Sequence, residues 1–372
     1  MPFSERRGIF LFRENALSHP LIKRLGHLMC RGIAYGKESI SIGEKFFCAN
    51  IIDIFPLKAY DRKNRTRKED AMLRQAVFNR IRLSNLEQNL GLYGIHLYCN
   101  GEEAAFQFRS DDRVNLHSAS KTFLSVAVGI CLDERRLALS DRALSYFPEF
   151  AEYASAGSEK ITLRDLLHMS SGKENFWFSV PLEQSLDWAR QFWADPIKSE
   201  PGTNFYYSNA CTYILGRVVE KVAGKNVRDF LVPLLFEPLK IFNPQWNRCP
   251  LGHPLCATGL QLTTGELARL GRLLLQKGSW EGKQIVSEEY VEQLQLDCIE
   301  TESGSGEPEN SQGYGYQVWR CVYPGAYRLD GKYGQYSIIV PDKDAVVTVT
   351  AHNEKNCGDI IRAVFRDVVE DL

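Results

Sequence analysis

Hydrophobic and polar positions follow two different periods along the chain, and these periods predict the order of its elements. Apolar residues recur at roughly helical spacing in residues 69–87, which predicts a helix. Two apolar segments follow, joined by Asn100-Gly101, a pair typical of the tight turn in a β-hairpin. Strand character returns near the C-terminal end, in the segments YGYQVWRCV, AYRLDG, GQYSIIVP and AVVTVTAH. An amphipathic helix over residues 357–372 closes the chain.

The middle of the chain is predicted to be mostly helical. The long apolar stretch TFLSVAVGICLDERRL indicates a buried helix that begins near Ser118. Thr162 is followed three residues later by Asp165, a spacing that favours a capping box at another helix start. Helices are also expected in the segments TLRDLLHM, NACTYILGRVVEKVAG, TTGELARLGRLLLQKG and SEEYVEQL. Residues 302–315 are rich in Gly, Ser and acidic residues, so we expect a mobile loop there.

This order predicts an α+β fold whose antiparallel sheet is built from both ends of the chain. Strands come first, then many helices, then strands again with a final helix, so the helical residues are inserted between two halves of one sheet. We expect residues 68–117 together with 312–372 to form the sheet domain with flanking helices. Residues 118–311 would form an inserted, all-helical domain. Residues 1–67 mix short apolar runs with basic clusters, and we interpret them as an N-terminal extension that packs on the main body.

The charge balance excludes a strong field of either sign. Lys and Arg number 45 and Asp and Glu number 46, so the formal net charge is −1, and nothing global would attract nucleic acid or an anionic membrane. No run approaches the roughly 20 apolar residues of a transmembrane helix, and the N-terminus lacks the apolar run of a secretory signal. We therefore expect a soluble, cytoplasmic protein that acts on a small molecule, and its oligomeric state is left open.

The cysteines do not form a recognisable framework. Ten cysteines are scattered along the chain, which favours reduced thiols over disulfides. Cys249 and Cys256 flank His253, a grouping that could suggest a metal. The chain has no second ligand pair at zinc spacing, so no metal site is predicted.

The first candidate for chemistry is the tetrapeptide Ser118-Ala119-Ser120-Lys121. Residues three apart share one face of a helix, so the Ser118 hydroxyl and the Lys121 amine can touch. The N–H groups at a helix start stabilise an oxyanion, and a lysine buried by the apolar run that follows could be neutral enough to accept a proton. Taken alone, the tetrapeptide is better explained by an ordinary helix cap. A second copy at residues 170–173 contains Gly172 and leads into no apolar helix, so we interpret it as a turn.

The second candidate is Tyr207-Ser208-Asn209, which directly precedes a predicted helix. Tyr207 and Asn209 lie two residues apart in an extended segment, so both side chains can face one cleft. A phenol near two lysines would have a lowered pKa and could act as a base, while the Asn209 amide could hold the substrate and Lys121. A helix cap beside a packed tyrosine is the alternative.

The third candidate is Lys332-Tyr333-Gly334-Gln335, just before a predicted strand. Gly334 would let a substrate approach the backbone, and a backbone N–H at a strand edge can hold an oxyanion. Lys332 would add positive charge that lowers the pKa values of Lys121 and Tyr207. A β-turn before an edge strand is the alternative.

In this order, S-x-x-K, Y-x-N and K-x-G, the motifs resemble those of the serine β-lactamases and penicillin-recognising peptidases. The resemblance is to the branch that contains class C β-lactamases, D-alanyl-D-alanine carboxypeptidases and related esterases, and it covers roughly residues 85–372. It also rests on further segments that occur in the same order in that family, namely ITLRDLLHMSSG, PGTNFYYSN, ILGRVVEKVAG, GLQLTTGELARLGRLLLQKG and AVVTVTAH.

The resemblance implies nucleophilic catalysis in two steps, acylation and hydrolysis, with no metal or organic cofactor. Ser118 would be the acylated nucleophile and Lys121 would accept its proton. Tyr207 would carry that proton to the leaving group and later activate the water.

The resemblance also implies which residues bind the substrate. Asn209 would hold the substrate and orient Lys121, and Lys332 would tune the electrostatics. Gly334 would keep the strand edge open, and the backbone N–H groups of Ser118 and Gln335 would form the oxyanion hole.

One position departs from the family pattern. Tyr333 stands where family β-lactamases usually have Thr or Ser, a small hydroxyl that helps to bind the substrate carboxylate. This departure favours a small ester or amide over a β-lactam or a D-alanyl-D-alanine peptide. Residues 176–178, Phe-Trp-Phe, could form an apolar acyl pocket or belong to the core. His117 is interpreted as structural, because neighbours on a helix face different directions.

The sequence thus predicts a serine hydrolase that acts on a small ester or amide through an acyl-enzyme at Ser118. A true β-lactamase or D-alanyl peptidase, an acyltransferase, and an inactive binding or sensor relative remain as alternatives. An unpaired ammonium in an apolar setting is costly, so a protein without catalysis has no physical reason to keep Lys121 there. G-x-S-x-G, H-E-x-x-H and P-loop motifs do not occur in the sequence.

Overall fold

The computed structural model describes residues 76–178, 186–301 and 307–372. The predicted N-terminal extension, residues 1–67, lies outside the described residues, as does the 302–306 part of the loop predicted to be mobile. The helix predicted over residues 69–87 is described from residue 76 onward and contains α3, Asn79–Glu87.

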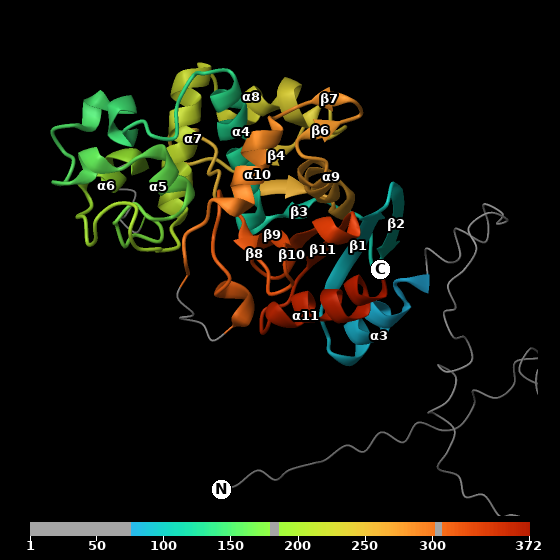
Figure 1. The fold of residues 1–372 in the computed structure, drawn as a ribbon. Coiled ribbons are helices and arrows are strands. Elements are labelled where there is room, and N and C mark those ends of the chain that lie inside the picture. Colours follow the sequence, from blue (N-terminus) through green and yellow to red (C-terminus); the bar gives the residue numbers. More distant parts are fainter. Residues whose placement is uncertain (1–75, 179–185, 302–306) are drawn as a thin grey trace, which may run out of the picture. The chain divides into compact units, whose positions relative to one another are not determined.

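A six-stranded antiparallel sheet joins the two ends of the sequence (Figure 1). Its order is β2-β1-β11-β10-β9-β8, so strands from the beginning of the described chain pair with strands from its end. The strands are β1 Leu92–Cys99, β2 Glu102–Gln107, β8 Trp319–Arg320, β9 Tyr327–Gly331, β10 Gln335–Val340 and β11 Ala345–Ala351. Both residues of the Asn100-Gly101 turn have positive φ, as a two-residue hairpin requires. The predicted α+β fold is confirmed.

Helices cover both faces of this sheet (Figure 1). Helix α11, Gly358–Asp367, buries its apolar stripe against one face, and α3 adds Ile81 to the same core. Helix α9, Thr264–Leu275, packs on the other face, where Gly271 lets the helix approach Ser337 and Val346 of the sheet closely. Because strand side chains alternate between the two faces, the sheet supplies a separate core on each side.

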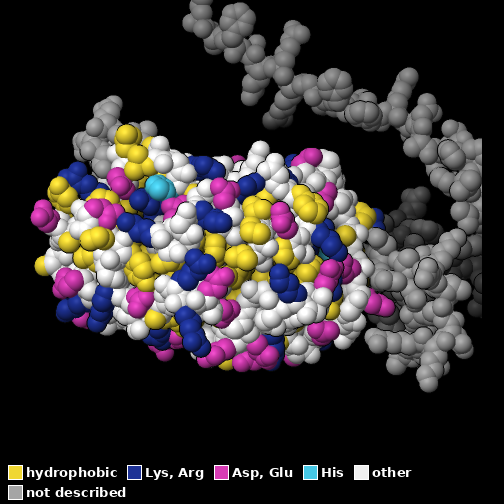
Figure 2. Space-filling model, turned by 90° about the horizontal axis from the view of Figure 1, so that it is seen from above, with side chains coloured by type: hydrophobic (Ala, Val, Ile, Leu, Met, Phe, Trp, Pro, Cys, Tyr) yellow, Lys and Arg dark blue, Asp and Glu magenta, His cyan; other side chains and the backbone are white. Residues whose placement is uncertain are grey.

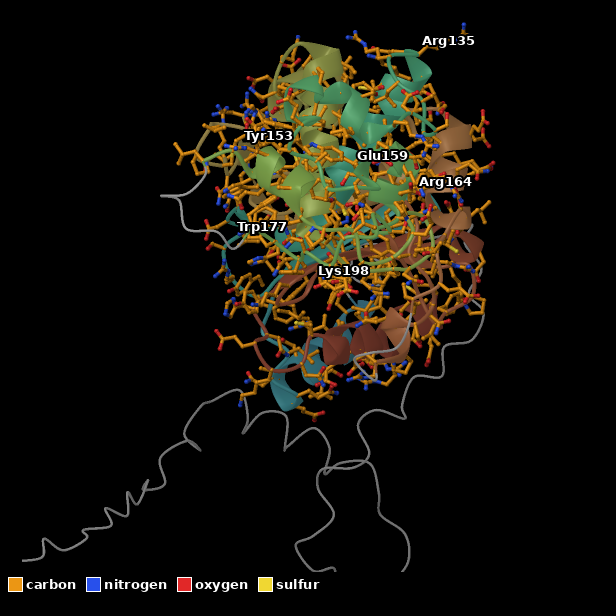
Figure 3. All side chains as sticks on the ribbon, turned by 90° about the vertical axis from the view of Figure 1, so that its left-hand side faces the viewer. Arg135, Tyr153, Glu159, Arg164, Trp177 and Lys198 are labelled. Carbon is orange, nitrogen blue, oxygen red and sulfur yellow. The ribbon has the colours of Figure 1, made fainter. Side chains whose placement is uncertain are left out.

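The inserted region is mostly helical, and Figure 3 views the molecule from its side. Besides α9, its α-helices are α4 Ser120–Asp133, α5 Leu163–Leu167, α6 Trp188–Ala194, α7 Asn209–Ala223, α8 Val227–Leu231 and α10 Glu288–Leu296. Helix α5 begins with the predicted capping box between Thr162 and Asp165.

The expectation of an all-helical insertion needs correction, because short strands also lie in this part of the chain. These strands are β4 Gln245–Trp246 and β5 Leu260–Leu262, which form a small sheet with β3 Val114–Asn115, and the hairpin of β6 Ser279–Trp280 and β7 Lys283–Gln284. Segments of two or three residues are too short to show a period in the sequence.

Helix α4 runs through the centre of the core, and every residue from Ser120 to Cys131 is buried. It packs against α7, and its start lies beside the end of β9. A 3₁₀ turn, His117–Ala119, precedes it and carries Ser118. The fold therefore brings the first predicted motif to the junction between the sheet and the helical region.

The remaining bulk features concern charge, thiols and membrane segments. Figure 2 shows one face of the molecule, on which acidic and basic side chains are interspersed. All eight cysteines in the described ranges are free thiols, and no group of three or more His, Cys, Asp or Glu there is placed to hold a metal ion. His253 contacts Glu220, with 2.6 Å between Nδ1 and Oε2. None of the helices in these ranges combines the length and the apolar character needed to span a bilayer.

Candidate active site

A cavity of about 790 Å³ opens beside the start of α4. Its walls come from the 3₁₀ turn before α4, the segment before α7, the end of β9 and the start of α11. Ser118, Tyr207, Asn209 and Lys332 line it, so four of the predicted site residues share one cavity.

Lys121 contacts two residues of the cavity wall, Ser118 and Asn209, and makes three polar contacts in all. Its Nζ is 2.9 Å from Ser118 Oγ, as the helical spacing predicts. It donates a hydrogen bond of 2.6 Å to Asn209 Oδ1 and one of 2.9 Å to the carbonyl oxygen of Ala257. Only 1% of Lys121 is exposed. The amine is therefore held in one position by groups from three separate segments.

Burial lowers the pKa of Lys121 from 10.5 to about 7, because a desolvated ammonium is unfavourable. The charge that opposes this shift is the carboxylate of Asp330, which raises the pKa. The sequence expectation that Lys332 tunes Lys121 is not reproduced in the described structure. The Lys332 ammonium acts on His117 instead, whose pKa is lowered mainly by burial and secondly by Lys332.

Tyr207 also contacts the nucleophile, but its protonation differs from the expectation. Its hydroxyl hydrogen-bonds with Ser118, and the Lys121 amine lies 4.9 Å from the centre of its ring. Burial raises the pKa of Tyr207 far above its ordinary value, whereas the sequence analysis predicted a lowered pKa. The correction follows from desolvation, which outweighs the nearby charges. Tyr207 is thus a neutral phenol in this structure.

The turn before α4 fixes Ser118 at the cavity. His117 has φ 49°, a left-handed conformation that is uncommon for a residue with a side chain. Asn115 stabilises this turn, because its Oδ1 accepts hydrogen bonds from the N–H groups of His117 and Gly259. The His117 ring packs edge-on against Tyr333. His117 lines the cavity beside Ser118, and its sharp turn points Ser118 toward Lys121.

The third motif is only partly brought to the site. Lys332 lines the cavity, but Gly334 and Gln335 are not among its lining residues in the described structure. A Cβ at Gly334 would overlap Ile360 of α11, and the Gln335 side chain bonds to the Ala351 carbonyl. These two residues therefore face α11 and β11.

Gly331, one residue before this motif, is the glycine that touches the turn bearing Ser118. A Cβ at Gly331 would overlap the Leu116 carbonyl oxygen and lie 3.2 Å from the Ala119 nitrogen. Gly331 pairs with Gln335 across β9 and β10, which leaves residues 332–334 as the connecting turn. Asp330 precedes Gly331 and also lines the cavity.

Aromatic side chains form another wall of the cavity. Of the predicted apolar group, Phe176 and Trp177 line the cavity, whereas Phe178 is buried and stacks on Trp188. Trp319 of β8 also lines the cavity and stacks on Tyr207, with 5.7 Å between ring centres.

The second S-x-x-K copy is a turn, as predicted, since Gly172 has φ 76°. Its lysine, Lys173, is 1% exposed and donates hydrogen bonds to Ser155 and Ser158. Burial lowers its pKa to about 8. Lys173 lies in the helical region, where its hydrogen bonds connect separate loop segments.

Sequence reasoning missed three contributors to this site. The Ala257 carbonyl gives no signal in a sequence, because any residue offers the same backbone oxygen. Trp319 lies far from the motifs in the chain. Asp330 could have been found, since it lies in a predicted strand only two residues before Lys332 of the third motif.

Comparisons with known proteins identify the family of this chain. Residues 94–365 match the family model described as Beta-lactamase. The 6-aminohexanoate-dimer hydrolase of Paenarthrobacter ureafaciens is 25% identical over 268 residues, 66% of this chain and 68% of that protein. The lovastatin esterase of Penicillium rubens is 28% identical over 160 residues, 37% of this chain and 40% of that protein.

Solved structures show the same fold. A class C β-lactamase superposes with a TM-score of 0.67 and 15% identity, and covers 83% of this chain and 99% of its own. A penicillin-binding protein homologue from Caulobacter crescentus has a TM-score of 0.62 and 18% identity, and covers 79% of this chain and 96% of its own.

Proposed function

This chain belongs to the β-lactamase family and is a serine hydrolase, and from that premise we propose that it hydrolyses a small ester or amide through an acyl-enzyme at Ser118. Acylation would form a bond between Ser118 Oγ and the acyl carbon and break the bond to the leaving alcohol or amine. Water would then cleave the Ser118 ester and release the acid. The cavity of about 790 Å³ suits a small molecule, and the similar proteins are named as a dimer hydrolase and an esterase.

One observation carries this proposal, which is the set of contacts around the buried Lys121 amine. A neutral amine has two hydrogens and one lone pair. Asn209 Oδ1 and the Ala257 carbonyl oxygen accept those two hydrogens, so the lone pair is directed at Ser118 Oγ, 2.9 Å away. With a pKa of about 7, much of Lys121 is neutral near pH 7 and can take the Ser118 proton.

Two further features support the later steps. The neutral Tyr207 phenol contacts Ser118, so it can relay the proton from Lys121 to the leaving group. We assign the oxyanion hole to the backbone N–H groups of Ser118 and Lys332, in place of Gln335. Gly331 supports this choice, because only a residue without Cβ lets β9 lie this close to the turn that bears Ser118.

The experiment is to label the protein with a fluorophosphonate and to assay 4-nitrophenyl esters and nitrocefin, for wild type, Ser118→Ala and Ser120→Ala. Ser120 is a matched control, since it belongs to the same tetrapeptide but its Oγ accepts a hydrogen bond from the Leu260 N–H. We expect labelling and turnover in wild type and Ser120→Ala, and neither in Ser118→Ala. Turnover retained by Ser118→Ala would exclude this mechanism.

The same assay separates the alternatives. An inactive binding relative would not be labelled at Ser118. An acyltransferase would form the acyl-enzyme but transfer the acyl group to an added alcohol rather than to water, which product analysis detects. Rapid nitrocefin turnover would identify a true β-lactamase.

A further inference from the structure

Asp330 places a carboxylate in the catalytic cavity. Side chains alternate along strand β9, so the buried Leu329 and Gly331 share one face, and Asp330 points to the other. Its side chain is 23% exposed and lines the cavity. It shares this cavity with Ser118 and Tyr207, and its charge raises the pKa values of Lys121 and Tyr207.

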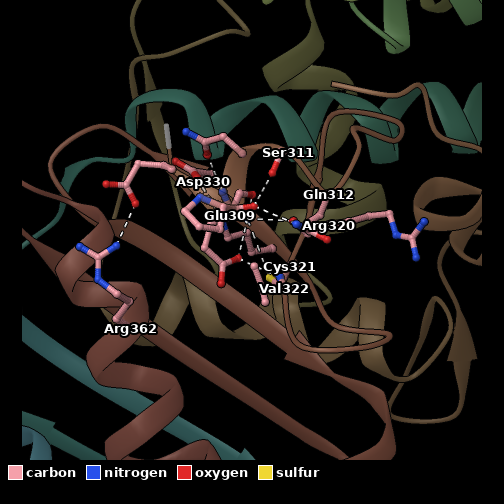
Figure 4. A network of polar contacts seen from close by, with 12 residues as sticks. Glu309, Ser311, Gln312, Arg320, Cys321, Val322, Asp330 and Arg362 are labelled. Atoms are coloured by element: carbon pink, nitrogen blue, oxygen red, sulfur yellow. Dashed lines mark hydrogen bonds and ion pairs between the residues drawn. The ribbon is translucent and has the colours of Figure 1, made fainter. Parts of the chain in front are cut away.

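The carboxylate is held in place by the fully buried Arg328. Arg328 Nε donates a hydrogen bond of 2.9 Å to Asp330 Oδ2. The guanidinium is fixed in turn by the carbonyl oxygens of Glu309 and Arg320, at 3.1 and 3.0 Å, in the network drawn in Figure 4. No hydrogen bond from the described residues reaches Asp330 Oδ1, so this oxygen remains available to a ligand.

Aromatic rings face the same space. Tyr207 and Trp319 are stacked in the cavity wall, and Phe176, which is 54% exposed, lies beside Tyr207. Aromatic faces attract cations, and apolar walls desolvate alkyl groups. A positioned carboxylate beside such a wall is suited to an alkylammonium group and unsuited to a carboxylate.

We propose that Asp330 and the adjoining aromatic wall form a subsite for an organic cation, so that the substrate carries an ammonium group close to its scissile ester or amide bond. This inference rests on the proposed function and narrows its substrate class. It also bears on the third motif, since Asp330 lines the cavity beside Gly331, whereas Tyr333 is not among the lining residues in the described structure.

Other charged groups also line the cavity, and they determine which substrate charges the experiment must compare. Lys332 and Lys355 also line it and could attract an anion, while Glu309 and Glu307 add negative charge. Glu307 accepts a hydrogen bond of 2.8 Å from Arg362 of helix α11. Figure 4 shows Arg362 apart from Asp330. Because these lysines could attract an anion, the experiment also includes an ester that carries a carboxylate.

The experiment measures kcat/KM for matched esters that differ only in charge. Choline hexanoate is compared with its neutral isostere 3,3-dimethylbutyl hexanoate, which places the cation in the leaving group. A second series of 4-nitrophenyl esters ends the acyl chain in trimethylammonium, tert-butyl or carboxylate. We expect the cationic ester to be preferred about tenfold over its isostere in at least one series, and less so at high salt.

Two variants test whether Asp330 causes the preference for the cationic ester. Asp330→Asn keeps the side-chain shape, and the cationic-to-neutral ratio of kcat/KM should fall to about one. The ratio cancels any general loss of catalysis that follows from a changed pKa of Lys121. Glu307→Gln is the matched control, because it removes one negative charge from the same cavity and should leave the ratio unchanged.

Binding to Ser118→Ala, measured by calorimetry with the same esters, separates this inference from the proposed function. If no ester is hydrolysed but the cationic ester still binds more tightly than its isostere, and Asp330→Asn added to that variant removes the difference, the subsite stands and the catalytic proposal fails. Equal kcat/KM and equal binding for the cationic and neutral esters, a preference for the carboxylate ester, or a ratio unaffected by Asp330→Asn would overturn the subsite. Should Asp330→Asn not fold, the isostere ratio of the wild type decides by itself.

Discussion

Replacing Lys121 with Met should change the pH dependence of stability in a calculable way. The folded protein holds this amine at a pKa of about 7, whereas in the unfolded chain its pKa is the ordinary 10.5. Between these values the unfolded state binds the proton and the folded state does not, so the wild type gains stability as pH rises. The gain is about 1.4 kcal/mol per pH unit once the folded amine is deprotonated. Met has no group that titrates.

Urea unfolding of wild type and Lys121→Met at pH 7 and pH 9 tests this prediction. Allowing for partial protonation of the folded amine at pH 7, the unfolding free energy of the wild type should rise by about 2 kcal/mol relative to the variant. The packing change caused by the substitution is the same at both pH values, so it cancels in the difference. Other titrating groups, such as Lys173, are present in both proteins, so their contribution cancels as well. A gap that stays constant between pH 7 and pH 9 would show an ordinary pKa for Lys121 and would refute the neutral-amine argument.

Three other predictions concern the site. The kcat/KM of the wild type should rise with pH to a plateau with a midpoint near 7, because only neutral Lys121 accepts the proton; an activity that falls through this range would contradict it. Gly331→Ala should reduce kcat by about 10²-fold, since its Cβ would displace the turn before α4, and ester kinetics measure this. Arg328→Met should lower the unfolding free energy by about 3 kcal/mol or more, because it leaves Asp330 without its partner; unchanged urea unfolding would argue against this.

The local sequence was sufficient for much of the fold. Thr162 and Asp165 form the capping box that their spacing predicts, and Asn100-Gly101 forms the hairpin turn. These features depend on contacts between residues a few positions apart, so the spacing in the sequence is enough to predict them. The contact between Ser118 and Lys121 was predictable for the same reason, since residues three apart share a helix face.

The third motif shows a contact that the local sequence could not predict. Lys332 and Gly334 have the spacing of a motif, but the spacing does not reveal which glycine touches the turn before α4. The pairing of Gly331 with Gln335 decides this, and strand register depends on residues far apart in the chain.

The sequence by itself determined the elements, their order and the types of residue available for chemistry, because propensity, capping and turn formation act over a few residues. Only the tertiary structure decided the electrostatics of the site. Burial by distant segments lowers the pKa of Lys121 and raises that of Tyr207, and the charge of Asp330 acts on both groups. Desolvation and charge interactions depend on distance in space, and distance in space is set by the packing of the whole fold.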